Sequence, residues 1–306
     1  MARLKIPYTK RAKTLDEQIA TLRRHEVVIL DEEKAKEYLS DIGYYRLGFY
    51  LHPFEITYPH LDGRRRHDVQ PGTRIEDMVA LYYFDFDLRN ILNRYLSRIE
   101  VAVRTALLYE LSNKYHHNPT WFVDPGVVTS NFITDFPTVA YNAIKKNDAI
   151  KRHHKKYIGQ FAPAWKTMEY MTLGNLETLY DSLLLNKDKK LVSNRFGEPA
   201  TATFKSYLSA IRELRNACAH GKAVFDLKLY NGIRSGKAGT FSAANRHTMQ
   251  EALVVVDYML NYISENRVKD MWYDIYAATA RLYGKTPVIR PIIESSTGII
   301  LPKVGK

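Results

Sequence analysis

Residues 74 to 113 contain no glycine or proline, and any fold of this chain must accommodate that uninterrupted segment. Apolar side chains recur along it at helical spacing, at Leu81, Leu88, Leu92, Leu96, Ile99, Val103 and Leu107. This period places them on one face of an α-helix, so we expect one long helix or two nearly in line. Other helices must cover that apolar face, which favours an all-α fold.

Shorter helical patterns occur on both sides of this segment. Thr14 and Glu17 have the spacing of a capping box that starts a helix, and Asp31 starts a second helix that Gly43 ends. Glycine and proline interrupt the aromatic segment 44–59, so the pattern does not favour a helix there. Later helical patterns cover residues 145–157, 164–186 and 204–220, and a last helix is expected over residues 249–284.

Domain boundaries are expected at polar segments that contain turn-forming residues. The basic loop at residues 60–73 follows the first helices, and we place a boundary near Pro71. Residues 1–71 then form an N-terminal helical region, and residues 72–285 form the main helical domain. From residue 286 to 306, proline, glycine and β-branched residues follow in no regular order, so we expect an extended C-terminal tail.

The charge of the chain indicates its partners. Lysine and arginine number 45 against 33 aspartate and glutamate, a net charge of +12 that favours nucleic acid, with an acidic protein or a membrane surface as alternatives. No window is apolar enough to span a membrane, and the N-terminus lacks an apolar signal core. The one cysteine, Cys218, excludes an internal disulfide and a multi-cysteine metal site. We expect a soluble cytoplasmic protein that uses no metal and no cofactor.

Arg215, Asn216 and His220 form the main concentration of chemically competent residues. Asn216 and His220 are four apart on a predicted helix and share a face, and Arg215 is long enough to bend toward them. Gly221 is expected to end the helix, which puts His220 in the last turn, where the helix dipole favours an imidazolium. Histidine can move protons, a guanidinium can stabilise phosphate charge, and the RNA 2′-hydroxyl can attack without a metal. In the structural alternative, His220 caps the helix and Arg215 pairs with Glu213 or a neighbouring carboxylate.

The segment RNACAHG resembles the signature of HEPN-type ribonucleases, in which an arginine and a polar residue precede a histidine near a helix end. The whole chain resembles the Abi, or abortive infection, family of bacterial phage-defence proteins, of the AbiD/AbiF-like kind. The resemblance rests on the segment from Tyr8 to Phe54, on LYYFDFDLRNILNRYLSRIEVAVRTAL, on MEYMTLGNLETLYDSL and on LRNACAH. It implies a HEPN-like helical bundle with an N-terminal helical extension.

The resemblance also implies the roles of the motif residues. Arg215, Asn216 and His220 take the catalytic positions, and two copies meet as a homodimer to form one cleft. Members of the family often carry a second histidine directly after the motif histidine, but this chain has Gly221 there, which increases the importance of a partner chain's His220. A toxin of this kind needs restraint by an inhibitory RNA or a protein antitoxin, and the positive charge favours RNA.

Other candidate residues have both structural and functional interpretations. Glu100 and Arg104 lie four apart in the long helix and are expected to form an ion pair, with a role in positioning the motif helix as the alternative. Two basic groups are candidate RNA-binding surfaces or simply solvated faces: Lys151, Arg152, Lys155 and Lys156, and the cluster Arg64, Arg65 and Arg66. The adjacent histidine pairs lack the further ligands that a metal site requires.

These observations lead to one expected function and one alternative. The expected function is a metal-independent endoribonuclease that cleaves RNA through 2′-hydroxyl attack in phage defence by abortive infection. The alternative is a non-catalytic RNA-binding or structural HEPN module, in which Arg215 and His220 hold RNA or a dimer interface. The sequence has no nucleotide-binding glycine-rich loop, no serine-hydrolase elbow and no helix-turn-helix pattern, so other classes have less support.

Overall fold

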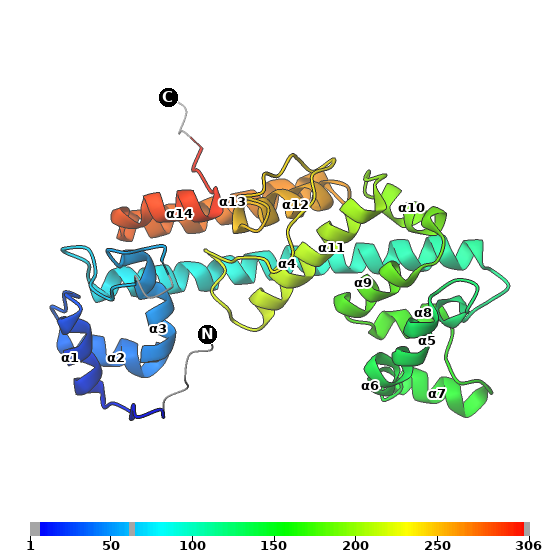
Figure 1. Ribbon diagram of the computed structural model, residues 1–306, viewed down its shortest axis with the longest axis horizontal. Helices are drawn as coiled ribbons and strands as arrows, with labels where there is room; N and C mark the ends of the chain where they lie inside the picture. Colours follow the sequence, from blue (N-terminus) through cyan, green and yellow to red (C-terminus); the bar gives the residue numbers. More distant parts are fainter. Residues whose placement is uncertain (1–6, 61–64, 303–306) are drawn as a thin grey trace. The chain divides into compact units, whose positions relative to one another are not determined.

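The segment without glycine and proline forms a single helix, α4 (Ile75–Lys114), as its apolar period predicts (Figure 1). The computed structural model describes residues 7–60 and 65–302. Within that part of the chain the fold is all-α, and β-structure is limited to isolated bridges such as Val28 to Arg74 and Glu55 to Val69. The all-α class expected from the sequence is therefore confirmed.

The other elements follow in chain order. They are α1 (Leu15–Arg24), α2 (Glu32–Ile42), α3 (Tyr44–Leu51), η1 (His52–Phe54), η2 (Trp121–Val123), α5 (Ser130–Phe136), the π-helical turn η3 (Pro137–Tyr141), α6 (Asn142–Ile144), α7 (Asp148–Lys156), α8 (Ala164–Thr167), η4 (Met168–Tyr170), α9 (Leu173–Ser182), α10 (Asn186–Asn194), α11 (Thr201–Ala219), α12 (Met249–Asn261), α13 (Glu265–Lys285), η5 (Pro287–Ile289) and α14 (Arg290–Thr297).

The chain divides into two compact units. Unit 1 comprises Met1–Phe86 and Thr279–Ile292, and unit 2 comprises Asp87–Ala278 and Ile293–Lys306. The division falls inside α4, whereas the sequence placed a boundary near Pro71. The difference has a physical reason: the Val28 amide donates to the Thr73 carbonyl at 2.9 Å and the Ile75 amide donates to the Val28 carbonyl at 3.1 Å, so backbone hydrogen bonds join the start of α4 to the segment after α1.

Unit 1 contains the helices that the capping residues predict. The Thr14 hydroxyl accepts a hydrogen bond from the Glu17 amide, and the Glu17 carboxylate accepts one from the Thr14 amide, which completes the capping box of α1. The Asp31 side chain caps α2. The aromatic segment after Gly43 forms helix α3, which the sequence pattern did not favour. Its glycine and proline do not prevent this, because the proline lies beyond the end of α3 and buried side chains recur at helical spacing on one face.

Unit 2 is built around the remainder of α4. Leu88, Leu92, Leu96, Ile99 and Val103 are completely buried along one face. The motif helix α11 packs against α9, α10 and α12, and its own buried face is largely aromatic and aliphatic. This packing fixes α11 along most of its length and leaves its other face to solvent.

Two expectations near the C-terminus were wrong. The expected single helix over residues 249–284 is two helices, α12 and α13, separated at Ser264, a residue type that competes for backbone hydrogen bonds. Residues 287–297 of the expected extended tail instead form η5 and α14. Pro287 and Pro291 lie in first turns, where proline is tolerated, and Ile289 and Ile293 are fully buried.

None of the helices in the described part of the chain has both the length and the apolar character needed to cross a bilayer.

Candidate functional site

The C-terminal end of α11 presents the predicted motif. The helix ends at Ala219, His220 is the C-cap, and Gly221 has φ +66°, the left-handed conformation that favours glycine. The Lys222 amide donates to the Ala217 carbonyl at 3.0 Å, which closes a Schellman motif. The turn places His220 at the tip of the helix with an exposed side chain, and no hydrogen-bond partner for its imidazole is found among the described residues.

Arg215 is held between two neighbours. Its Nε lies 3.4 Å from Glu100 Oε2 of α4, and its Nη1 donates to Asn216 Oδ1 at 3.2 Å. The side chain is 32% exposed, so part of the guanidinium reaches solvent while its stem is fixed. Because a guanidinium has five N–H donors, these two contacts leave donor capacity for an incoming anion.

Glu100 connects α4 to the motif helix. Its other oxygen, Oε1, accepts a hydrogen bond from Arg104 Nη2 at 3.0 Å, which is the intrahelical pair that the spacing predicts. Arg104 also donates to the Met171 carbonyl at 3.0 Å. Glu100 and Arg104 are each only 13% exposed. The pair is thus part of a network that extends from α4 to Arg215, and the two interpretations of this pair are not mutually exclusive.

A residue that sequence reasoning missed supports the turn after His220. Arg89 of α4 is buried, and its Nη1 donates to the Lys222 carbonyl at 3.2 Å. Arg89 and Glu100 are eleven residues apart, so they differ by only about 20° around the helix and face the same side. The signal available in the sequence was an arginine in phase with Glu100 on the long helix. Its burial is known only from the packing.

Glu213 has a role different from the one considered for it. Its carboxylate accepts hydrogen bonds from the backbone amides of Tyr230 at 2.7 Å and of Asn231 at 3.4 Å. Glu213 therefore anchors the loop that follows the motif, and the carboxylate that pairs with Arg215 is Glu100.

The basic helix α7 carries Lys151, Arg152, Lys155 and Lys156, whose side chains are all exposed. Tyr157 follows directly and is 50% exposed, with the Lys156 ammonium 5.3 Å from its ring centroid. Burial, together with the charges of Lys166 and His154, lowers the pKa of His153. Exposed cations beside an exposed aromatic ring are the combination that binds single-stranded nucleic acid.

The second basic cluster is divided by the structure. Arg64 lies outside the described residues. Arg65 donates through Nε and Nη2 to the two oxygens of Glu55, both at 2.7 Å, and this places Arg65 in a structural ion pair. Arg66 pairs with Asp68 at 2.8 Å and stays 65% exposed. Of the two described arginines, only Arg66 presents an accessible guanidinium for phosphate.

Glu55 is completely buried, and two histidines contact its carboxylate in addition to Arg65. His52 Nδ1 lies 2.9 Å and His67 Nδ1 lies 3.1 Å from its oxygens. Burial alone would raise the pKa of Glu55, but the hydrogen bonds from Arg65, His52 and His67 outweigh burial and lower it from 4.5 to about 2. This cluster joins Arg65 and His67 to Glu55 and His52 within unit 1.

In the described residues, no group of three or more His, Cys, Asp or Glu side chains is arranged to hold a metal ion. The ring centroids of His116 and His117 lie only 3.8 Å apart. Two adjacent side chains on a helix would diverge further, but these residues lie in a turn after α4.

The sequence model of a family described as Abi-like protein matches residues 37–226 of this chain. The match covers more than half of the chain and includes α4, α11 and the motif residues at the end of α11. Comparison with curated proteins and with solved structures gave no match. On the strength of the family match, the chain belongs to the Abi-like protein family.

Proposed function

We propose that this protein is a metal-independent endoribonuclease that acts in abortive infection. The observation that carries the proposal is the end of α11, where an exposed His220 and a partly exposed Arg215, held by Glu100, are presented together with Asn216. Membership of the Abi-like family suggests a role in abortive infection. The assignment to HEPN ribonucleases of the AbiD/AbiF-like kind is part of the proposal.

The chemistry that these residues support is RNA transesterification. The 2′-oxygen attacks the adjacent phosphorus, the bond from phosphorus to the 5′-oxygen breaks, and the products are a 2′,3′-cyclic phosphate and a 5′-hydroxyl. An imidazole takes the 2′-hydroxyl proton, and an imidazolium supplies a proton to the leaving 5′-oxygen. The Arg215 guanidinium stabilises the charge that develops on the phosphate oxygens, and Asn216 orients that guanidinium through the 3.2 Å contact.

The two proton transfers favour a homodimer. Each chain contributes one motif histidine, and Gly221 stands where a second histidine would follow. In a dimer that places two copies of the α11 terminus around one RNA, His220 of one chain acts as base while the partner's His220 acts as acid. The exposed position of His220 beyond the helix end supports such an arrangement.

The basic side chains of α7 and Arg66 are the proposed contacts for the RNA backbone outside the cleavage site. An inhibitory RNA is the proposed restraint, since the net charge of +12 attracts it by the same contacts that attract the substrate. A protein antitoxin is the alternative restraint.

The test is cleavage of labelled single-stranded RNA and of the DNA of the same sequence by the purified chain in excess chelator. Cleavage of RNA alone, with 2′,3′-cyclic phosphate ends, is expected from the native chain and not from His220→Ala. His117→Ala removes another exposed histidine of unit 2 and is expected to cleave normally. Intact RNA with a folded dimer at any enzyme concentration would refute the catalytic proposal.

One observation favours a second function, RNA binding without cleavage. Arg215 already pairs with Glu100, and Gly221 removes the neighbouring proton donor. A binding module would bind RNA equally well with histidine or alanine at position 220 and would release no product in either case. Sequence-independent, salt-sensitive binding alone does not separate the two functions.

A further inference from the structure

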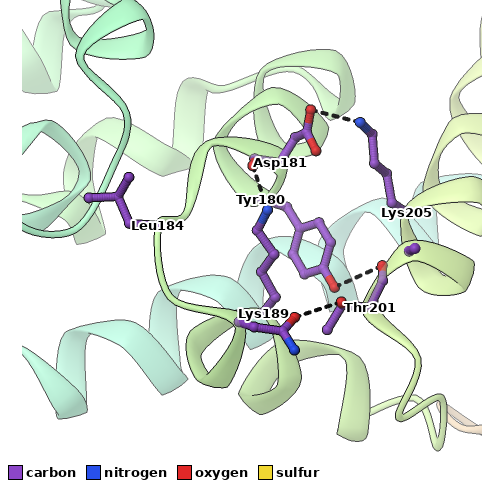
Figure 2. A pocket seen from close by; sticks show the side chains of 8 residues that line it. Tyr180, Asp181, Leu184, Lys189, Thr201 and Lys205 are labelled. Carbon is purple, nitrogen blue, oxygen red and sulfur yellow. Dashed lines mark hydrogen bonds and ion pairs between the residues drawn. The ribbon is translucent and has the colours of Figure 1, made fainter.

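A cavity of about 310 Å³ lies among α9, α10 and α11, at the opposite end of α11 from the motif. Figure 2 shows its labelled lining residues, including Lys189 of α10 and Lys205 of α11. Its volume is at the lower end of the roughly 300–1,000 Å³ typical of small-ligand sites. It suits one nucleotide unit and not a longer segment.

The charged groups of the cavity favour an anion. Two lysines and one aspartate line it, a net charge of +1. Lys205 Nζ lies 2.7 Å from Asp181 Oδ2, and Lys189 Nζ donates to the Asp181 backbone carbonyl at 2.7 Å, as the dashed lines in Figure 2 show. Lys205 and Asp181 are 46% and 48% exposed. An ion pair as exposed as this is weak, so a phosphate can replace the carboxylate at little cost.

Two helix starts add to the positive potential of the cavity. α10 begins at Asn186 and α11 begins at Thr201, and both residues line it. Neither helix has a side-chain cap at its N-cap residue, Leu185 or Ala200, and the Thr201 hydroxyl bonds to Asn186 Oδ1 at 2.7 Å. Uncapped first-turn amides carry the positive end of the helix dipole and favour phosphate.

The cavity is in line with the motif along α11. Arg212 and Asn216 follow Lys205 by seven and eleven residues, so each lies within about 20° of Lys205 around the helix axis. Side chains on this face are at least partly exposed at positions 205, 212 and 216, and Arg215, also partly exposed, is the neighbour of Asn216 in the chain. At 1.5 Å per residue, Lys205 and Arg215 are about 15 Å apart along the axis. That is roughly four to five nucleotides of a stacked strand at ~3.4 Å each.

We propose that this cavity is a subsite that holds one phosphate-bearing nucleotide of a single-stranded RNA whose other part lies at the α11 motif. The proposal rests on the proposed function for its substrate class. Lys189 and Lys205 bind the phosphate, and the half-exposed Leu184 provides an apolar wall for the base. Arg212, between the two ends, is held by Glu177 of α9 and presents a further cation to the strand.

The test measures whether the cavity and the motif bind one RNA together. Oligonucleotides of 4 and 12 nucleotides are titrated by fluorescence anisotropy against His220→Ala, which is expected to bind without cleaving, with and without Lys189→Ala and Lys205→Ala. The longer RNA can occupy both ends of α11 and should bind more tightly than the shorter RNA. The double lysine variant is expected to reduce this length advantage about tenfold, the loss expected when charge-assisted contacts to phosphate are removed.

Lys190→Ala is the matched control, because Lys190 is exposed on α10 but does not line the cavity. A length advantage unchanged in the double lysine variant, or reduced equally by Lys190→Ala, overturns the subsite. The subsite is also overturned if binding of free uridine monophosphate depends on both lysines and RNA binding does not. The cavity would then bind a free nucleotide and not part of an RNA strand. Unchanged thermal unfolding of each variant ensures that lost binding reflects the cavity, and Lys205→Gln provides a milder substitution if alanine destabilises the chain.

The outcomes for the subsite and for the ribonuclease are separable. A lysine-dependent length advantage without any cleavage by the native chain supports the subsite and refutes catalysis. Cleavage of RNA without any lysine effect refutes only the subsite.

Discussion

Replacing Glu55 by glutamine tests whether the buried carboxylate stabilises unit 1. The side chain is completely buried and accepts hydrogen bonds from Arg65 at 2.7 Å and from His52 and His67 at 2.9 and 3.1 Å. Glutamine keeps the shape but removes the charge that these donors face. Arg65 then remains as a cation with no carboxylate partner, which is the costly way to break a buried pair.

The pKa of Glu55 gives the size of the effect. It falls from 4.5 in the unfolded chain to about 2 in the fold, which corresponds to about 3 kcal/mol of unfolding free energy. Because the folded pKa is the lower one, this stability is fully present above pH 4.5 and is lost as the pH falls through about 2. The difference between native and Glu55→Gln chains should therefore be constant near neutral pH and shrink in acid.

The assay must report on unit 1 itself. The three tryptophans, Trp121, Trp165 and Trp272, all lie in unit 2, so their fluorescence does not follow the loss. Hydrogen exchange of the Ile56 amide, which donates to the Asp68 carbonyl at 3.0 Å, reports the opening free energy directly.

Exchange should accelerate by about two orders of magnitude in Glu55→Gln at pH 7, which is about 3 kcal/mol. Arg66→Ala removes an exposed cation next to Arg65 and should change the opening free energy by less than about 1 kcal/mol. An effect of Glu55→Gln below that of Arg66→Ala, or one that persists unchanged at pH 3, would show that the carboxylate does not stabilise unit 1 in its charged form.

Three further predictions concern unit 2. Glu100→Gln weakens the attachment of Arg215 and should lower kcat for RNA cleavage roughly tenfold while KM stays within about twofold, and a change in KM alone would contradict a positioning role. Gly221→Ala forces a Cβ into φ +66° and should lower the unfolding free energy by about 1 kcal/mol in thermal denaturation, with Gly221→Asn costing less. Asp188→Ala removes a fully buried carboxylate that accepts a hydrogen bond from the Tyr115 hydroxyl at 2.5 Å and pairs with Lys114. The unfolding free energy measured in urea should fall by about 3 kcal/mol, and a fall below about 1 kcal/mol would refute the importance of the pair between Lys114 and Asp188.

Local features of the fold were predictable from the sequence. The capping box at Thr14, the cap at Asp31, the continuous helix α4 and the left-handed Gly221 depend on neighbouring residues and on period, and each is present. The ion pair between Glu100 and Arg104 is of the same kind, because four residues along a helix bring two side chains together.

Features that depend on distant parts of the chain were not predictable. The contact from Arg215 to Glu100 joins residues 115 positions apart, and no local pattern encodes it. Arg65 looked like a surface cation within a basic run until folding placed Glu55 against it. Among the aromatic residues of α3, Tyr50 is buried whereas Tyr45 is 83% exposed, although both lie in one short aromatic run. In each case tertiary packing decides the outcome, and the local composition does not.

The sharing of Glu100 between two arginines affects how the site can respond to an anion. When a phosphate approaches, Arg215 can turn from the carboxylate toward it, since their contact is 3.4 Å and the arginine is partly exposed. Arg104, only 13% exposed, remains bonded to Glu100 through that exchange. The carboxylate is therefore never left without a cation, and the motif arginine can change partners without uncovering a buried charge. Arg104 thus remains the counter-ion of Glu100, which allows Arg215 to bind the phosphate.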